Sequence, residues 1–134
     1  MEKIILCVDD EKLVLESLVS QLRSHYGDKF VYETAENPEL AWEIIHEAEE
    51  TGDKIWVVIS DWLMPIQKGD QFLMEVNKHL PDSKLIMLSG HAEQDAIQRA
   101  RTYANLYRFI RKPWEKQEIT KAIDEITALR QANR

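Results

Sequence analysis

The sequence predicts an α/β fold, namely a doubly wound parallel sheet of five strands with helices on both faces. Five short apolar runs alternate with five segments in which apolar residues recur at helical spacing. Because a helical segment follows every run, we expect parallel strands joined by right-handed crossovers. The third run, Ile55–Ser60, is continuously apolar, which is typical of a strand covered on both faces.

The five strands are expected where these apolar runs lie. The first run ends abruptly in Asp9-Asp10-Glu11, and the fourth is closed by Ser89-Gly90. The second run is weaker than the others, so we expect it nearer an edge of the sheet. The predicted strands are Lys3–Val8, Phe30–Thr34, Ile55–Ser60, Lys84–Leu88 and Leu106–Ile110.

The five helices are expected between residues that start or stop helices. Asn37-Pro38 provides an N-cap followed by proline at the first helical position, which needs no N–H. Gly27 ends the first helix and Pro81-Asp82 ends the third. The fourth helix, Glu93–Tyr103, has a thin apolar stripe, and the last begins near Glu115. In chain order, the inward-facing residues are expected to be Leu15, Leu18, Val19, Leu22; Ala41, Ile44, Ile45, Ala48; Phe72, Leu73, Val76, Leu80; Ala96, Ile97, Ala100; and Ile119, Ala122, Ile123, Ile126, Leu129.

The length and charge of the chain narrow its class. With 134 residues it suits one domain, and surface scaling lets about 68% of its surface be buried. We expect a single domain over residues 1–134, with a folded core of about 3–127 and a C-terminal tail or linker stub at 128–134. Seventeen basic against twenty-four acidic residues give a net charge of −7, which argues against direct binding to nucleic acid or anionic lipid.

The single cysteine and the short apolar runs indicate the compartment. Cys7 cannot form an internal disulfide, and its place in an apolar run favours a small buried hydrophobe over a reactive thiol. No run approaches the ~20 apolar residues that cross a membrane, and no signal peptide is recognised. We therefore expect a soluble, cytoplasmic protein without a membrane partner.

Polar residues follow four of the five strands. Asp9 and Asp10 follow the first, Asp61 the third, Ser89 the fourth and Lys112 the fifth. Each has an ordinary alternative, as a helix cap, a turn residue or a solvated charge. Sites in open parallel sheets form outside the carboxyl ends of the strands, however, and the topology brings all five residues to one rim.

The chemistry of this set points to a cation and a phosphoryl group. Two carboxylates 4–5 Å apart repel by roughly 4 kcal/mol at an effective dielectric of 20, so three of them take up protons or bind a cation. Oxygen ligands at this density suit Mg²⁺. Lys112 adds a point charge for a phosphoryl oxygen, and Ser89 adds a hydroxyl donor.

The motifs at these strand ends are specific as a set. They are Val8-Asp9-Asp10, Asp61-Trp62-Leu63-Met64-Pro65 with Gly69 following, Ser89-Gly90, and Lys112-Pro113-Trp114. Over essentially its full length, the chain resembles the receiver domain of two-component response regulators, in particular the chemotaxis-regulator type. The resemblance implies a flavodoxin-like sheet of order 2-1-3-4-5.

The resemblance also implies the roles of the acidic residues. Asp61 matches the position that accepts a phosphoryl group from a histidine kinase phosphohistidine. Asp9 and Asp10 match the acidic pair that holds Mg²⁺, with Asp61 and the backbone carbonyl of Leu63 as further ligands.

The remaining motif residues match the phosphoryl contacts and the switch. Lys112 matches the lysine that contacts the phosphoryl group, and its bond to Pro113 is expected to be cis. Ser89 matches the hydroxyl that moves toward the phosphoryl group, and Phe109 matches the aromatic switch. Phe109 has no hydroxyl to fix an inward state, so a plain core aromatic stays an alternative. His91, like Leu63, occupies a position flanking the phosphoryl group, with a simple loop residue as its alternative.

The function implied by the resemblance is a signalling switch, not an enzyme. The implied partners are a sensor histidine kinase or phosphotransfer protein, and an output domain or partner at the face of the fourth helix, fifth strand and last helix. A homodimer stays open. Tyr103, Leu106, Tyr107 and Trp114 are interpreted equally as part of a partner surface or as packing at the sheet edge.

Three alternatives compete with this interpretation. A phosphatase of the haloacid dehalogenase type needs an Asp-x-Asp arrangement after the first strand and usually a cap domain, and Asp9-Asp10-Glu11 lacks the former. A flavin-binding electron carrier needs a glycine- and hydroxyl-rich phosphate loop there, where this chain has acids. A degenerate receiver that only docks partners usually lacks a site residue, whereas this chain has them all.

Overall fold

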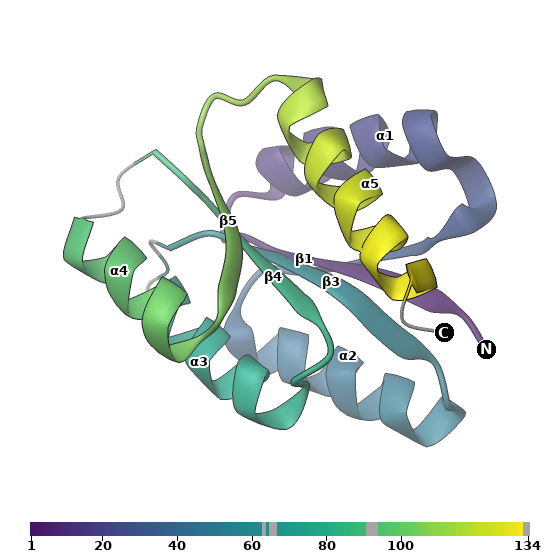
Figure 1. Cartoon of the computed structure of the whole chain (residues 1–134), viewed down its shortest axis with the longest axis horizontal. Helices are drawn as coiled ribbons and strands as arrows, with labels where there is room; N and C mark the ends of the chain where they lie inside the picture. Colours follow the sequence, from purple (N-terminus) through teal and green to yellow (C-terminus); the bar gives the residue numbers. More distant parts are fainter. Residues whose placement is uncertain (63, 65–66, 91–93, 133–134) are drawn as a thin grey trace.

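Strands and helices alternate along the whole chain, as the apolar pattern predicts (Figure 1). The structure is a computed structural model that describes residues 1–62, 64, 67–90 and 94–132. The elements are β1 (Lys3–Val8), α1 (Lys12–Tyr26), the short 3₁₀ helix η1 (Gly27–Lys29), β2 (Val31–Ala35), α2 (Pro38–Thr51), β3 (Lys54–Ser60), α3 (Gly69–His79), β4 (Lys84–Ser89), α4 (Gln94–Tyr103), β5 (Leu106–Arg111) and α5 (Lys116–Ala132).

The five strands form a parallel sheet of order β2-β1-β3-β4-β5. This confirms the doubly wound, flavodoxin-like topology. In the register, Leu6 of β1 lies opposite Glu33 of β2 and Val58 of β3. The central strand β3 is buried from Ile55 to Ser60, whereas β2 is only half-buried over most of its length, as expected for an edge strand.

Helices cover both faces of the sheet, and the alternation of strand side chains divides the core into two clusters. Leu6 and Val8 pack with α2, α3 and α4 on one face, whereas Ile5 and Cys7 pack with α1 and α5 on the other. We call these the α2–α4 face and the α1–α5 face. Cys7 is fully buried, and burial together with the charge of Asp9 raises the pKa of its thiol to about 12.

The boundaries of two helices confirm the signals in the sequence. Asn37 Oδ1 accepts a hydrogen bond from Leu40 N (2.9 Å), and Pro38 occupies the first position of α2. Gly27 follows α1 with a φ of 57°, which favours glycine, and its N–H donates to Arg23 O. These caps fix where α1 and α2 meet the loops around the sheet.

Some expected positions differ in the structure. Leu80 is not in α3, because the residue before a proline disfavours the helical conformation and Leu80 leaves it at φ −126°, ψ 70°. Leu129 is 44% exposed rather than inward-facing. Arg130 covers the core instead, with its guanidinium 4.7 Å from the centre of the Trp56 ring.

Other boundaries shift slightly. β2 begins one residue later than expected, at Val31. Helix α5 runs to Ala132, past residue 127 where we placed the end of the core. Val19 and Ile44 are half-buried. Glu93, the expected first residue of the fourth helix, lies outside the described residues.

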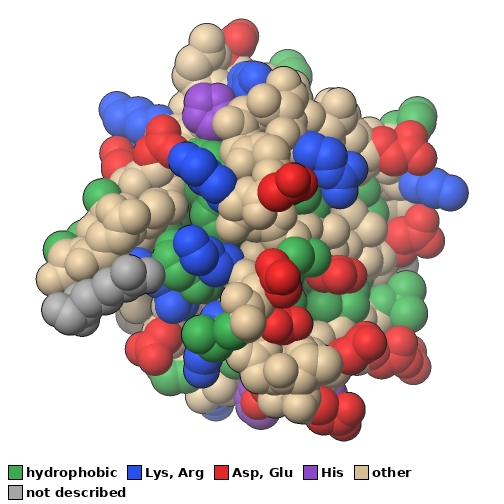
Figure 2. Space-filling view, turned by 90° about the vertical axis from the view of Figure 1, so that its right-hand side faces the viewer, with side chains coloured by type: hydrophobic (Ala, Val, Ile, Leu, Met, Phe, Trp, Pro, Cys, Tyr) green, Lys and Arg blue, Asp and Glu red, His purple; other side chains and the backbone are tan. Residues whose placement is uncertain are grey.

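The surface carries the charge surplus of the composition. Figure 2 views the side on which both termini lie, and acidic side chains predominate at its lower right. Among the helices that the structure describes, none has the length and apolarity to cross a lipid bilayer.

Candidate functional site

The strand ends converge at one rim of the sheet. The N–H of Asp61, after β3, donates to Val8 O at the end of β1 (2.9 Å). The N–H of Lys112, after β5, donates to Ser89 O at the end of β4 (3.2 Å). Backbone hydrogen bonds therefore join the four strand ends that carry the polar residues in two pairs, β1 with β3 and β4 with β5.

Three carboxylates meet at this rim. One carboxylate oxygen from each of Asp9, Asp10 and Asp61 lies within 4.8 Å of the others. Asp9 and Asp61 are only 3% and 5% exposed, whereas Asp10 is open to solvent. Asp9 Oδ1 also accepts from Glu11 N (2.9 Å), so this side chain holds the turn into α1 as well as facing the rim.

Lys112 places its ammonium group between two of these carboxylates. Its Nζ lies 2.7 Å from Asp9 Oδ2 and 3.6 Å from Asp61 Oδ1. Burial alone would lower the pKa of Lys112, but the hydrogen bond to Asp9 and the charges of Asp61, Asp9 and Glu11 outweigh it, and the pKa is raised. The lysine is therefore a fixed positive charge at neutral pH, and its peptide bond to Pro113 is cis.

The donor set at the rim fits a small, hard cation. It has three carboxylates, and Lys112 contacts two of them, Asp9 and Asp61. Carboxylate oxygens that face solvent on one side suit Mg²⁺, which keeps several waters. Asp9, Asp10 and Asp61 could therefore hold it. Leu63, whose carbonyl is the further expected ligand, lies outside the described residues, as do Pro65 and His91.

Ser89 and Phe109 lie on adjacent strands near the lysine. Ser89 is the last residue of β4, is 1% exposed and pairs in register with Arg111 of β5. Phe109 lies opposite Met87 and is half-buried against the α2–α4 face. The guanidinium of Arg111 lies 5.6 Å from the centre of the Phe109 ring. The aromatic ring is thus at the sheet edge rather than fully inside the core.

A cavity of about 720 Å³ opens at this rim. Asp10, Asp61, Ser89 and Lys112 line it, together with other residues that include Lys68. A groove of about 850 Å³ lies elsewhere, along α1 and β2, and contains none of these four residues. The rim cavity has room for a phosphoryl group beside Asp61 and a cation beside the acids.

A buried polar link that we did not predict connects the rim to α4. Trp62 Nε1 donates to Asp70 Oδ1 (3.1 Å), and Arg99 Nε donates to Asp70 Oδ2 (3.1 Å). Asp70, at the start of α3, is 1% exposed. Trp62 directly follows Asp61, so this link joins the residue beside the predicted phosphoacceptor to α3 and α4. Asp70 is an acidic residue in the first turn of α3, and only the fold shows that it is buried.

Gly69 allows a close approach behind Asp61. Its N–H donates to Trp62 O (2.7 Å). A Cβ at this position would lie 2.1 Å from Asp61 O and 2.7 Å from Trp62 Cα. The glycine in the motif is therefore required by contact with the backbone of Asp61 and Trp62.

Comparison with known proteins gives one consistent family. The sequence model of the response regulator receiver domain family matches residues 5–124. The chain is 29% identical, over 93% of its length, to the hydrogenase transcriptional regulatory protein HoxA of Bradyrhizobium diazoefficiens, and 34% identical, over 91%, to the sensor kinase CckA of Brucella abortus. These alignments cover 24% and 12% of the two relatives, so the chain spans only a small part of each.

A solved structure agrees over the whole chain. The response regulator receiver domain protein of Clostridium thermocellum superimposes with a TM-score of 0.81 at 28% identity, covering 100% of both chains. The fold of the chain is therefore that of a response regulator receiver domain.

Proposed function

The chain belongs to the family of response regulator receiver domains, and from this premise we propose that it is a phosphoacceptor switch in which Asp61 receives a phosphoryl group from a phosphohistidine. Receiver domains are signalling switches of two-component systems rather than classical enzymes. The observation that carries the proposal is the buried Asp61 carboxylate with Lys112 Nζ 3.6 Å from its Oδ1, beside the acidic pair.

The proposed transfer is a displacement at phosphorus. A carboxylate oxygen of Asp61 attacks the phosphorus atom, a P–O bond forms, and the P–N bond of the phosphohistidine breaks. The electron pair of that bond returns to the imidazole of the donor, and Asp61 becomes an acyl phosphate. The rim cavity leaves access to Asp61 from solvent, which a donor side chain of another protein requires.

The residues around Asp61 compensate the incoming charge. Phosphorylation adds about −1.5 to −2 charges. Lys112 is already between Asp9 and Asp61 and can donate to a phosphoryl oxygen without crossing the site. Asp9, Asp10 and Asp61, with the carbonyl of Leu63, would hold Mg²⁺, which supplies further positive charge to the phosphoryl oxygens.

We propose that the response then passes to the face formed by α4, β5 and α5. Ser89 moves toward the phosphoryl group, and its hydroxyl donates a hydrogen bond to it. Phe109 then fills the space that Ser89 leaves. The contact of Trp62 and Arg99 with Asp70 offers a second connection from the Asp61 segment to α4. A population change from 1:99 to 99:1 requires about 5.5 kcal/mol, and a few charged hydrogen bonds of about 1.5–3 kcal/mol each supply it.

The proposed partners follow from the family and from the relatives. A sensor histidine kinase or a phosphotransfer protein is the phosphoryl donor, and an output domain or separate partner reads the α4–β5–α5 face. In the two relatives the matching region is part of a much longer chain. We propose that residues 1–134 form one receiver domain, alone or within a longer regulator.

Intact-mass measurement tests the proposal. The chain is incubated with acetyl phosphate and Mg²⁺, and the expected result is an adduct of one phosphoryl group. Asp61→Asn should abolish the adduct, and a chelator should prevent it. Asp28→Asn, an exposed aspartate on η1, is the matched control and should keep the full yield. An adduct of undiminished yield in Asp61→Asn would refute Asp61 as the acceptor.

A further inference from the structure

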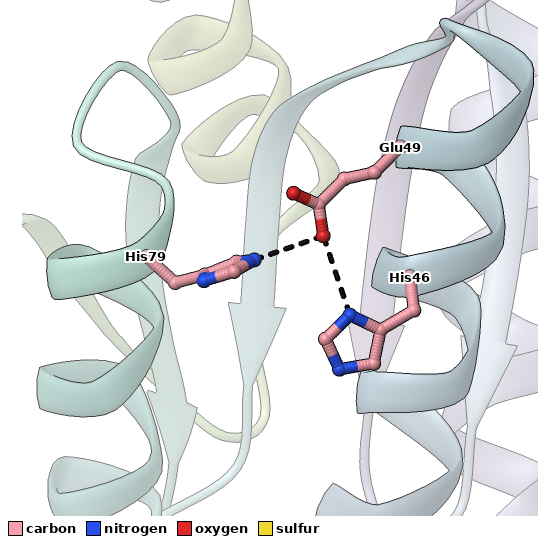
Figure 3. A group of neighbouring side chains, drawn as sticks. All are labelled: His46, Glu49 and His79. Carbon is pink, nitrogen blue, oxygen red and sulfur yellow. Dashed lines mark hydrogen bonds and ion pairs between the residues drawn. The ribbon is translucent and has the colours of Figure 1, made fainter.

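A second group of metal-ligand side chains lies between α2 and α3. Figure 3 shows His46 and Glu49 on α2 and His79 on α3, with both imidazole rings turned toward the Glu49 carboxylate. Glu49 Oε1 lies 3.3 Å from His46 Nδ1 and 2.8 Å from His79 Nε2. The three ligand atoms all lie within 4.8 Å of one another.

We propose that His46, Glu49 and His79 form a binding site for a divalent transition-metal ion of the zinc type. Two imidazole nitrogens and one carboxylate oxygen are a donor set that suits Zn²⁺. The rim, by contrast, offers carboxylates and fits Mg²⁺. The proposal is independent of the phosphoacceptor function.

The distances from the Glu49 carboxylate oxygen to the two imidazole nitrogens are close to those of a tetrahedral site. Metal–ligand bonds of about 2.0–2.2 Å hold neighbouring ligand atoms about 3.4 Å apart in a tetrahedron. The His46–Glu49 separation of 3.3 Å already fits this value. The His79–Glu49 separation of 2.8 Å must lengthen slightly, and both side chains are exposed enough to adjust. A water completes the fourth position.

The surroundings restrain the two rings. Trp42 stacks on His46, with ring centres 5.8 Å apart, and meets the edge of His79 at 5.4 Å. Trp42 is itself held edge-on by the fully buried Phe72. One side of the site is thus a fixed aromatic wall, while the other side is open to solvent, from which an ion can enter.

The position in the fold also favours a cation. His79 is the last residue of α3, and Glu49 lies in the last turn of α2. The carboxyl end of a helix carries a partial negative charge that attracts cations. Because each helix runs back against the preceding strand, these ends lie at the opposite edge of the sheet from the rim. The two sites are therefore separated by the length of the sheet.

Calorimetric titration with Zn²⁺ tests this site. The full chain is titrated in excess Mg²⁺, which occupies the rim. We expect one Zn²⁺ per wild-type chain, and affinity at least tenfold lower in His46→Ala and in His79→Ala, because each change removes a ligand. His25→Ala, an exposed histidine on α1, is the matched control and should bind like wild type.

Two further measurements locate the ion. In Asp61→Asn the Zn²⁺ isotherm should be unchanged, because the rim is not involved. Amide resonance shifts on Zn²⁺ addition should concentrate at the carboxyl ends of α2 and α3. Three results would each overturn the proposal: no Zn²⁺ binding by the wild type, wild-type affinity in His46→Ala and His79→Ala, or competition by Mg²⁺ for the Zn²⁺ site. Circular dichroism confirms that the variants are folded.

Discussion

The two faces of the sheet are held by polar contacts of different kinds. On the α1–α5 face, Tyr26 OH donates to Thr120 O (2.9 Å) and to Asp124 Oδ1 (2.8 Å). Trp114 Nε1 donates to Gln21 Oε1 (2.7 Å). Both sets of contacts join α1 to α5 or to the segment just before it. They join the helices of this layer to each other, and Trp114 also lines the rim cavity.

On the α2–α4 face, the buried polar contact leads to the rim instead. Asp70 joins Trp62, beside Asp61, to Arg99 on α4. Two of the three helices here are also short, with 11 residues in α3 and 10 in α4; α2 has 14, against 15 in α1 and 17 in α5. Of the side-chain contacts compared here, the one through Asp70 reaches the residue next to Asp61, the proposed phosphoacceptor.

Gly69→Ala should destabilise the α2–α4 face more than any of the other variants below. The added Cβ would lie 2.1 Å from Asp61 O, which is backbone and cannot turn aside. Overpacking of this kind costs about 3 kcal/mol, and the displaced Asp61 should lower the phosphorylation yield. Urea unfolding and intact-mass measurement check both effects. The control is Gly90→Ala, whose Cβ meets Lys112 O at an ordinary 3.7 Å; equal loss in both variants would contradict the explanation.

Asp70→Ala should destabilise the chain by about 2–3 kcal/mol. The change leaves the buried Trp62 N–H without its acceptor, and an unsatisfied buried donor is costly. Asp70→Asn keeps an acceptor for Trp62 but loses the ion pair with Arg99, so its loss should be smaller. Urea denaturation of both variants measures the difference. If Asp70→Asn were as unstable as Asp70→Ala, the ion pair rather than the Trp62 contact would dominate.

Tyr26→Phe tests the α1–α5 face. The variant should lower the free energy of unfolding by about 1 kcal/mol at pH 7, because the hydrogen bonds of the hydroxyl are lost. Burial and the hydrogen bond to Asp124 raise the pKa of Tyr26. A raised tyrosine pKa adds stability that is full below the unfolded pKa of about 10 and is lost at higher pH. The difference between wild type and Tyr26→Phe should therefore narrow above pH 10.

Urea unfolding of wild type and Tyr26→Phe from pH 7 to above pH 10 measures this difference in the free energy of unfolding. The phosphorylation yield at neutral pH should be equal in wild type and Tyr26→Phe, because this face has no polar contact with the Asp61 segment among the contacts described above. A lower yield would show that the two faces are coupled.

Arg99→Ala should have the smallest effect on stability, about 1 kcal/mol, because Trp62 still donates to the buried Asp70 carboxylate and the lost arginine is 49% exposed. Its main effect should instead be on the response of α4 to phosphorylation of Asp61. The phosphorylation yield should stay at the wild-type value while the amide shifts of α4 on phosphorylation decrease. Arg101→Ala, also exposed on α4, should leave these shifts unchanged. Full α4 shifts in Arg99→Ala would exclude this link as a route.

The fold and the rim could be predicted because their signals are local. Each strand is an apolar run. The carboxyl ends of parallel strands share one rim, and this rule places Asp61 near Asp10 although the two residues are 51 positions apart in the sequence. The exit of Leu80 from α3 also had a local signal, the following Pro81, which outweighed its helical spacing.

The contacts between helices could not be predicted in this way. Arg99 and Asp70 are 29 positions apart, and His79 and Glu49 are 30 apart. Helical periodicity gives the face of each helix but not which residues of two neighbouring helices meet. The buried charge of Asp70 also contradicts the rule that Asp is exposed, and only its two donors explain it.

The fully buried thiol of Cys7 can report local unfolding of the sheet through its chemical reactivity. In the folded state the sulfur is inaccessible and stays protonated, so an alkylating reagent such as iodoacetamide must wait until β1 separates from its neighbours. The rate of carbamidomethylation in native buffer then reports how often the centre of the sheet opens. Because the chain has one cysteine, every modified molecule marks the same event.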